Sequence, residues 1–218
     1  MRVGDARGEP VLGLRERKKR RTRATLIDSA VVLCDRQGYD GTTVDQIAAS
    51  ADVSPRTFSR YFATKDAIAL ALIDEVLDRV AAELATQPLD IGHFEALRRA
   101  YIGMALNSKL APAGALSSYR LMQILRITVS SGTLQQAAVE FRASPVDVAL
   151  AARMGVPVDD RRVRLMAAVF GGVLMTALQE VTRCSSTLAG VGVDETVAAF
   201  ESVCADFSDE FAGLGLAV

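Results

Sequence analysis

Residues 43–65 read TVDQIAASADVSPRTFSRYFATK, and this segment contains the most specific structural pattern in the sequence. It opens with a capping box, because Gln46 follows Thr43 at the third position, so a short helix is predicted to begin there. Ser54 followed by Pro55 is an N-cap with proline at the first helical position, which predicts the start of a second helix. Two short helices joined by a three-residue turn are the helix-turn-helix layout.

The second helix of this pair has the composition of a helix that reads DNA. Such a motif needs an apolar core that fixes the angle between its helices, and a short polar face that reaches base edges. The apolar positions are Ile47, Ala48, Val53, Phe58 and Phe62. The polar face predicts the base-reading residues, which are Arg56, Thr57, Ser59 and Arg60.

Anchors for DNA phosphates are predicted on both sides of the reading helix. Thr42 and Thr43 stand at a helix N-terminus, whose free N–H groups favour an anion. Tyr61 and Lys65 follow the second helix and are predicted to contact phosphates from the other side.

A basic run over residues 15–23 precedes the motif and leads into an amphipathic helix that is predicted over 20–37. Residues 1–19 are predicted to form a flexible basic arm that orders on phosphate or enters the minor groove. Further phosphate contacts are expected from Lys18, Lys19 and Arg20. The alternative is a solvated leader that makes no DNA contact.

Residues 22–68 resemble the DNA-binding domain of the TetR family of bacterial transcriptional regulators. The matching runs are TVDQIA from Thr43, VS from Val53 and TFSRYFATK from Thr57. They fit the family pattern T-x-x-x-I-A, then V-S-x-x-T-x-Y/F-x-Y/H-F, then a lysine that opens the next helix. Asp52 departs from the pattern, which usually has glycine there, but aspartate tolerates a left-handed backbone better than most residues.

The resemblance also implies roles for individual residues. By position, Thr43, Tyr61 and Lys65 are implied to contact phosphates. The same carry-over places Arg56, Thr57 and Ser59 toward the major groove, with Arg60 in either role.

Composition is that of an ordinary globular protein. The chain has 218 residues, of which 50% are hydrophobic and 23% charged, and this balance excludes a largely disordered chain. Residues 1–65 hold 13 Lys and Arg against 8 Asp and Glu, a net charge of +5, whereas residues 66–218 have a net charge of −6. Such asymmetry favours a front end that faces a polyanion.

The periodicity is helical along the whole chain, so the expected fold is all-α with about nine helices. An N-terminal three-helix domain over 20–65, containing the helix-turn-helix, precedes a helical ligand-binding and dimerisation domain over 66–218. The predicted helices cover residues 20–37, 43–50, 55–62, 65–86, 93–107, 116–129, 133–155 with a kink or restart at Ser144-Pro145, 160–183 and 194–212.

The longest apolar run, from Leu165 to Leu178, is shorter than the ~20 residues of a spanning helix and is interpreted as a buried core helix. With no signal peptide recognised, a cytoplasmic location is expected. Three scattered cysteines give no disulfide framework or zinc spacing, so no metal or cofactor is expected.

A homodimer is expected because operators of this class are read as two half-sites. The last predicted helix has a seam of apolar residues at spacings of four and three, and the preceding helix has small residues at i and i+4. The predicted dimer interface consists of Ala167, Gly171, Val197, Phe200, Cys204, Phe207 and Phe211. The alternative is that these faces are buried within one subunit.

TetR-like proteins usually hold a ligand cavity among the helices that correspond to 93–183. Candidate lining residues for an effector are Phe94, Tyr101, Met104, Tyr119, Met122, Leu125, Phe170 and Met175. Met and aromatic residues at helical spacing are also common in plain cores, and that alternative stays open.

The expected function is a repressor that binds a palindromic DNA operator as a dimer and is released by a small hydrophobic effector. An enzyme is not expected, because His93 has no partner in a recognisable catalytic motif and no catalytic residue is assigned. Two alternatives remain, a helical adaptor that binds protein and a redox-responsive regulator that acts through Cys184.

Overall fold

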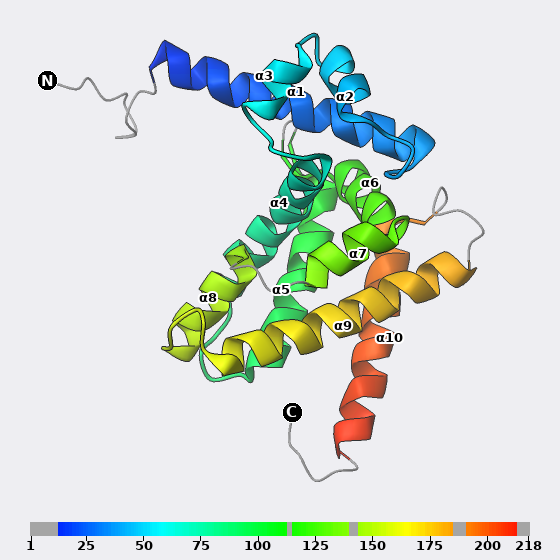
Figure 1. The fold of residues 1–218 in the computed structure, drawn as a ribbon. Coiled ribbons are helices and arrows are strands. Elements are labelled where there is room, and N and C mark those ends of the chain that lie inside the picture. Colours follow the sequence, from blue (N-terminus) through cyan, green and yellow to red (C-terminus); the bar gives the residue numbers. More distant parts are fainter. Residues whose placement is uncertain (1–12, 113–114, 140–143, 185–190, 213–218) are drawn as a thin grey trace, which may run out of the picture. The chain divides into compact units, whose positions relative to one another are not determined.

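A computed structural model describes residues 13–112, 115–139, 144–184 and 191–212. All regular elements in these ranges are helical, which confirms the all-α prediction (Figure 1). The helices are α1 (Leu14–Gln37), α2 (Val44–Ser50), α3 (Pro55–Ser59), α4 (Lys65–Thr86), α5 (His93–Asn107), the 3₁₀ turn η1 (Ser108–Leu110), α6 (Ser118–Val129), α7 (Gly132–Val139), α8 (Pro145–Met154), α9 (Arg161–Cys184) and α10 (Val193–Ala212).

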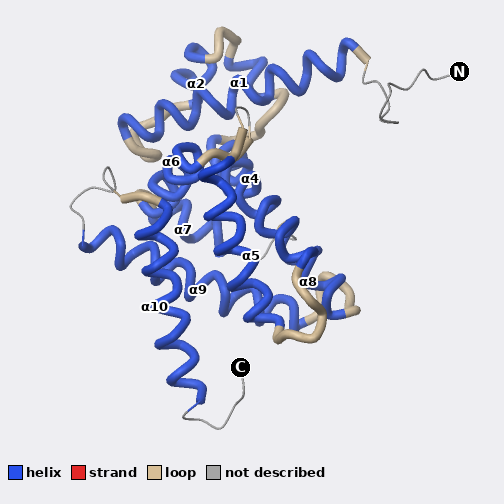
Figure 2. Tube along the Cα trace, turned by 180° about the vertical axis from the view of Figure 1, so that it is seen from behind, coloured by secondary structure: helices blue, strands red, loops and turns tan. Residues whose placement is uncertain are grey.

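The chain divides into two compact units, Met1–Ile68 and Ala69–Val218. Helix α4 begins in the first unit and continues in the second. The tube view in Figure 2 shows that the described parts of both units consist of helices and short connecting loops. The predicted limits of the arm, the reading domain and the ligand-binding domain stay a prediction.

Two helix boundaries differ from the prediction. Helix α1 begins at Leu14, so residues 14–19 are helical rather than part of a flexible arm. Helix α3 ends at Ser59 because the amides of Arg60 and Tyr61 bond carbonyls three residues back, and this tightens the last turn. The predicted segment over 133–155 restarts at Ser144-Pro145, which is one of the two predicted outcomes, and the described ranges therefore hold ten α-helices.

The restart of the chain at Ser144 has a clear local cause. Ser144 accepts a hydrogen bond from the amide of Asp147, and the Asp147 carboxylate accepts one from the amide of Ser144. This capping box is followed by Pro145 at the first helical position, which fixes a new helix start. Gly155 then ends α8 in the left-handed conformation, as the predicted break requires.

In the second unit, α9 and α10 pack against each other and both contact α5 (Figure 1). Helix α9 is long and apolar enough to cross a membrane by length and composition alone. One row of its side chains is buried, including Phe170 and Val173, whereas Leu165, Ala168 and Gly172 are exposed. The interpretation of this segment as a buried core helix is therefore correct for one face only.

Candidate nucleic-acid interface

The start of α2 is fixed by the predicted capping box. The Thr43 hydroxyl accepts a hydrogen bond from the Gln46 amide at 3.2 Å, and the Gln46 side chain accepts one from the Thr43 amide at 2.9 Å. Gln37, at the end of α1, donates through Nε2 to the Gly41 carbonyl at 2.9 Å and to Gln46 Oε1 at 3.0 Å. The end of α1, the loop and the start of α2 are thus joined by side-chain hydrogen bonds, and Gln37 is a contributor that the sequence reasoning missed.

The turn between α2 and α3 depends on one unusual backbone conformation. Asp52 has φ 54°, and it is the one residue other than glycine with positive φ in the described ranges. The Val53 amide then donates to the Ala48 carbonyl at 3.0 Å, which closes the turn. Ser54 caps α3 by accepting a hydrogen bond from the Thr57 amide at 3.1 Å, so both predicted caps are confirmed.

A compact apolar core holds α2 and α3 at a fixed angle. Ile47, Ala48 and Phe58 are almost fully buried, and the rings of Phe58 and Phe62 lie 5.8 Å apart between centroids. Because Ala48 has no side chain beyond Cβ, the two short helices can approach closely. This core leaves the opposite face of α3 exposed.

The predicted base-reading residues lie together on that exposed face and at its end. Arg56, Ser59 and Arg60 are exposed, and Thr57 is half-buried. The Thr57 hydroxyl lies 3.0 Å from the Ser54 hydroxyl, so part of its hydrogen-bonding capacity is used within the cap. The two arginines are the longest donors on this face and extend beyond the shorter polar groups.

Tyr61 lies close to α1 and to the residue before it. The Arg60 guanidinium lies over its ring at 5.6 Å from the centroid, and Thr22 of α1, whose hydroxyl donates to the Lys18 carbonyl at 3.0 Å, is a neighbour of its hydroxyl. The proximity of the Thr22 hydroxyl lowers the pKa of Tyr61, and the positive charges of Arg60 and Lys19 act in the same direction. Thr22 was not predicted, although its helical spacing from Leu26 could have identified it.

The basic part of α1 lies beside this corner. The Arg23 guanidinium is 5.1 Å from the centroid of the Phe62 ring. Lys18, Lys19 and Arg20 are all exposed, as a phosphate contact requires. These three residues belong to helix α1, so the spacing of their Cα atoms is fixed in the protein without DNA.

Lys65, at the start of α4, has an intramolecular partner. Its ammonium donates to the Tyr39 carbonyl at 3.0 Å and lies 4.2 Å from the centroid of the Tyr39 ring. The Tyr39 hydroxyl donates to the Asp66 carboxylate, and burial together with that carboxylate raises the pKa of Tyr39. The cluster joins the α1–α2 loop to the start of α4, and the predicted phosphate contact of Lys65 stays a prediction.

Thr42 is used inside its own loop. It is only 1% exposed, its hydroxyl donates to the Gly38 carbonyl at 2.8 Å, and its amide donates to the Tyr39 carbonyl at 3.1 Å. It also accepts a hydrogen bond from Gln37 at 3.4 Å. Thr42 therefore stabilises the loop from the inside, and its predicted phosphate contact stays a prediction.

In the second unit, most of the predicted effector residues belong to the core. The rings of Tyr101, Phe170 and Phe200 form a cluster, with Tyr101 4.5 Å from Phe200 and 6.4 Å from Phe170 between centroids. Phe94, Met104, Met122 and Leu125 are also buried, and Met175 is half-buried. Tyr119 is 68% exposed, so it does not lie with them.

The hydroxyl of Tyr101 is the polar feature of this cluster. Its oxygen is buried and has no hydrogen-bond partner among the described residues. Burial raises the pKa of Tyr101, so the group stays neutral. A buried hydroxyl without a partner is unfavourable, which marks this position as unusual within the core.

The predicted apolar seam of α10 requires a correction. Val197, Phe200 and Cys204 are buried within the protomer, and the Phe207 ring packs 5.0 Å from Phe94 between centroids. The buried residues Val197, Phe200 and Cys204 pack inside the protomer and are not available to a second copy, whereas Phe207 is half-buried and its place in a dimer interface stays a prediction. The described side chains do not include that of Phe211.

The small residues of α9 remain accessible. Ala167 and Gly171 are half-buried, while Ala168 and Gly172 beside them are exposed. A Cβ built on either glycine meets no atom within 4 Å. On α10 the exposed positions include Ala198, Ser202 and Ala205.

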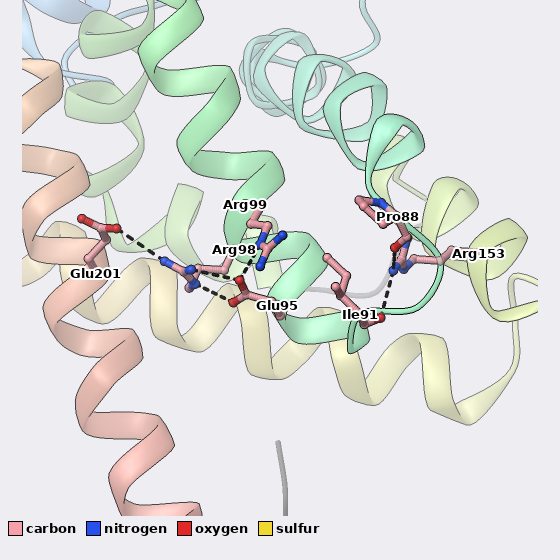
Figure 3. A network of polar contacts seen from close by, with 7 residues as sticks. All are labelled: Pro88, Ile91, Glu95, Arg98, Arg99, Arg153 and Glu201. Atoms are coloured by element: carbon pink, nitrogen blue, oxygen red, sulfur yellow. Dashed lines mark hydrogen bonds and ion pairs between the residues drawn. The ribbon is translucent and has the colours of Figure 1, made fainter.

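Two polar networks fix the second unit, and Figure 3 shows both. Arg98 of α5 lies 2.7 Å from Glu95 and 3.4 Å from Glu201 of α10, and its hydrogen bonds lower the pKa of Glu95. Arg153 of α8 donates to the carbonyls of Pro88 and Ile91, which follow the end of α4 (Figure 3), and also to the carbonyl of Gln87. Neither network was predicted from the sequence.

The cysteines and the histidine have structural surroundings. Burial raises the pKa of Cys34 and raises that of Cys204 to about 11, which keeps both thiols protonated. The Cys184 side chain lies outside the described residues, so the redox alternative is untested. His93 is the first residue of α5, as predicted, and the described ranges hold no group of three or more His, Cys, Asp or Glu placed to bind a metal.

Comparison with known proteins agrees with this geometry. The family model for bacterial regulatory proteins of the tetR family matches residues 26–72. The HTH-type transcriptional regulator TcmR of Streptomyces glaucescens is 35% identical over 168 residues, which cover 74% of this chain and 73% of that protein. The chain belongs to the TetR family.

Other TetR-family relatives match over shorter stretches or at the level of the fold. The HTH-type transcriptional regulator BetI of Paraburkholderia xenovorans is 38% identical over 68 residues, 31% of this chain and 33% of that one. SmeT, the repressor of the Stenotrophomonas maltophilia multidrug efflux pump SmeDEF, has the same fold with a TM-score of 0.52 at 17% identity, over 84% of this chain and 89% of SmeT. A TetR-family transcriptional regulator from Streptomyces coelicolor has a TM-score of 0.50 at 19% identity, and the match covers 85% of this chain and 98% of that one.

The TetR assignment and the geometry of the first unit lead to the same conclusion. The relatives are transcriptional regulators, and the short helix α3 is held by caps and core with two arginines exposed. This protein is therefore a DNA-binding transcriptional regulator.

Proposed function

We propose that the protein is a repressor that binds a palindromic operator as a homodimer and leaves it when a small effector binds the second unit. The observation that carries the proposal is the exposure of Arg56 and Ser59 on α3, and of Arg60 directly after it, while the Ser54 cap and the buried Phe58 fix the helix itself. A helix that is fixed before binding loses little backbone conformational entropy, so these residues are suited to reading base edges. The Thr57 hydroxyl, which is 3.0 Å from the Ser54 hydroxyl, can contribute one further hydrogen bond to DNA.

Phosphate contacts fix the register of α3 in the groove. We assign them to Thr43 at the start of α2, to Tyr61, and to the exposed cations Lys18, Lys19 and Arg20. Lys65 is kept as a candidate, because an ammonium has three N–H donors and the Tyr39 carbonyl accepts one of them. The protein would act in the cytoplasm, where its DNA lies.

The homodimer is proposed to form through the exposed faces of α9 and α10. Ala168, Gly172 and Thr176 make a row of small side chains on α9, and Ala198, Ser202 and Ala205 make another on α10. Small side chains let helices from two protomers approach closely. A two-fold dimer would present its two α3 helices about 34–36 Å apart, one turn of DNA.

Effector release follows from a difference in affinity between two dimer geometries. An effector that binds better to the geometry that does not fit DNA shifts the population and weakens operator binding. The buried Tyr101 hydroxyl supports an effector site in the aromatic cluster, because a bound molecule with a hydrogen-bond acceptor would satisfy it. Continuous α4, which spans both units, is the proposed lever.

The function is tested by selecting duplexes from a random pool with the purified protein. The proposal expects a palindromic winner bound by a dimer, with affinity that falls steeply as salt rises. Arg56→Ala should relax the base preference at one position of each half-site, by about 1–3 kcal/mol against the wrong base. A monomer that enriches no sequence would overturn the proposal.

Effector release is tested with small apolar molecules that raise the melting temperature of the protein. Those that also release the selected duplex are the effectors, and Tyr101→Phe should weaken release by an acceptor-bearing effector about 5- to 10-fold, the value of one hydrogen bond. If every molecule that stabilises the protein leaves DNA affinity unchanged, effector release is wrong while DNA binding stands.

A further inference from the structure

The loop between α1 and α2 is tied to the first turn of α4. The Tyr39 hydroxyl donates to the Asp66 carboxylate, and the Lys65 ammonium donates to the Tyr39 carbonyl at 3.0 Å. Tyr39 is 2% exposed, and the centre of its ring lies 4.2 Å from the same ammonium nitrogen. Burial and the Asp66 carboxylate raise the pKa of Tyr39, so the phenol keeps its proton and remains a donor.

Further hydrogen bonds join this loop to the start of α2. The Tyr39 carbonyl also accepts from the amide of Thr42 at 3.1 Å, and Thr42 directly precedes the residue that caps α2. Gln37, at the end of α1, donates to the Gly41 carbonyl at 2.9 Å and to Gln46 Oε1 in α2 at 3.0 Å. The end of α1, the loop and the start of α2 therefore form one connected structure.

The backbone of the loop is compact. The Thr42 hydroxyl donates to the Gly38 carbonyl at 2.8 Å, which closes the loop on itself. A Cβ on Gly41 would lie 2.7 Å from the Gln37 carbonyl oxygen, so the chain passes close to the end of α1 there. A loop of this kind moves as one piece, and its contacts with Lys65 and Asp66 decide how it is placed against the start of α4.

The two structures that meet at Tyr39 carry the proposed phosphate contacts on either side of α3. Thr43 stands at the start of α2, before α3, whereas Lys65 begins α4, after α3. Phosphate contacts fix the register of a protein on the duplex, and the phosphates of a duplex have a regular spacing. Two contacts can form together only if the protein holds their donors at a matching separation.

We propose that Tyr39 and Asp66 are positioning residues for DNA binding, which hold the start of α2 and the start of α4 at the separation that phosphate contacts on both sides of α3 require. The inference rests on the proposed function, because it depends on the phosphate contact of Thr43. Neither residue touches DNA itself, since Tyr39 is buried and the Asp66 carboxylate would repel a phosphate. Loss of their hydrogen bond leaves the DNA contacts in place but lets their separation vary, and ordering it again opposes binding.

The test compares Asp66→Asn with Asp66→Ala. Both remove the carboxylate charge at an exposed position, but only asparagine keeps an oxygen that can accept from the Tyr39 hydroxyl. Tyr39→Phe removes the same hydrogen bond from the other side and keeps the ring beside Lys65. Ile27→Val, at a buried position of α1 outside these contacts, is the control for a general loss of stability.

Affinity is measured for the duplex selected from the random pool, over a range of salt concentrations. Tyr39→Phe should bind about 3- to 10-fold more weakly than the natural protein, and Asp66→Ala more weakly than Asp66→Asn by a similar factor, the value of about one hydrogen bond. The slope of log K against log salt should be unchanged in Tyr39→Phe, whereas loss of a phosphate contact would lower it by ~0.9. Ile27→Val should bind as the natural protein does.

Hydrogen exchange in the protein without DNA distinguishes positioning from a general loss of structure. The bonded amides of Thr42 in the loop and Ala67 in α4 should exchange about tenfold faster in Tyr39→Phe. The bonded amide of Phe58 in α3 should keep its rate, because α3 has its own cap and core. In Ile27→Val the three amides should change together or not at all.

Natural affinity in Tyr39→Phe, or equal affinity of Asp66→Asn and Asp66→Ala, would overturn the inference while the proposed function stands. A lower salt slope in Tyr39→Phe, or exchange that accelerates equally at Phe58, would overturn it as well. If the natural protein enriches no duplex, the proposed function is wrong, and the positioning role of Tyr39 and Asp66 is wrong with it.

Discussion

At the scale of single residues, Asp52 shows how a turn can depend on one backbone angle. A left-handed conformation brings Cβ close to the following carbonyl oxygen, and only glycine avoids this cost fully. Aspartate is among the residues that tolerate it, so the helix-turn-helix forms in this chain with φ 54° at Asp52.

Replacing Asp52 by glycine should stabilise the protein. Removal of the left-handed strain outweighs the extra freedom of the unfolded chain, and the free energy of unfolding should rise by about 0.5–1 kcal/mol in urea titrations. The β-branched Asp52→Val should lower it by about 1–2 kcal/mol. If Asp52→Gly lowers the free energy of unfolding instead, the aspartate side chain stabilises the protein by more than the left-handed strain destabilises it.

His93 should make stability depend on pH. Its burial lowers the pKa below the usual 6.5, and the charge of Arg153 adds to this. The unfolded chain then binds the proton more tightly than the folded protein, so this contribution is present above about pH 6.5 and is lost as pH falls through the lower folded pKa.

The measurement is the free energy of unfolding at about pH 7 and about pH 5, for the natural protein and for His93→Gln. Protonation of carboxylates affects both proteins, so the difference between them isolates the histidine. The natural protein should lose more stability than the variant over this range. An equal loss would mean that His93 titrates alike in both states.

At the scale of elements, Arg153 connects α8 to the end of α4. Its guanidinium donates to three carbonyls of the chain that follows α4, two of which are drawn in Figure 3, and these carbonyls have no further turn of helix to bond. The planar fork of arginine suits several acceptors at once, whereas the lysine ammonium is a compact point charge.

Arg153→Lys should therefore lower the free energy of unfolding by about 2 kcal/mol, since at least one of the hydrogen bonds to a charged group is lost. The control is Arg99→Lys, which changes a half-exposed ion pair with Glu95 by about 0.5 kcal/mol or less. Thermal or urea unfolding of both variants measures the effect. Equal stability of the two variants would contradict a stabilising role for the Arg153 hydrogen bonds to the carbonyls after α4.

The helix ends show which features neighbouring residues can predict and which they cannot. Thr43 and Ser54 cap their helices as the sequence predicted, because a cap needs only a side chain and an amide within three residues. At Ser144 the sequence predicted a kink or a restart, and the structure has the cap of a new helix there. The early end of α3 was not predicted. Its last turn tightens by hydrogen bonds three residues apart, which no single residue type signals.

At the scale of the whole molecule, the proposed dimer depends on surfaces that the protomer leaves open. The exposed row of α9 contains Gly172, where an added side chain meets no atom of its own chain. A substitution there can act on association without disturbing the protomer.

Gly172→Arg should convert the dimer to a monomer and lower operator affinity at least tenfold, because a large cation enters a close contact between helices. The control is Val148→Arg on α8, an exposed position outside these faces, which should remain dimeric. Sedimentation velocity distinguishes the two states. A dimeric Gly172→Arg that binds DNA normally would place the interface elsewhere.

Local sequence patterns were sufficient to predict most of the helices, the helix-turn-helix and the polar face of α3. These depend on neighbours a few residues apart, so periodicity, caps and one turn residue were sufficient. The helical spacing of Phe94, Tyr101 and Phe170 also indicated that these side chains lie inside the second unit, since apolar residues at such spacing are buried in most folds.

Only the tertiary structure decided which buried face meets which partner. The α10 seam was predicted to join two protomers, yet it packs on α5 and α9, because an apolar stripe records that it is buried and not against what. In the same way the Thr42 hydroxyl bonds within its own loop, and residues 14–19 belong to helix α1 rather than to a flexible arm. Contacts between residues that are distant in sequence decide where these side chains pack, and no pattern of neighbouring residues predicts such contacts.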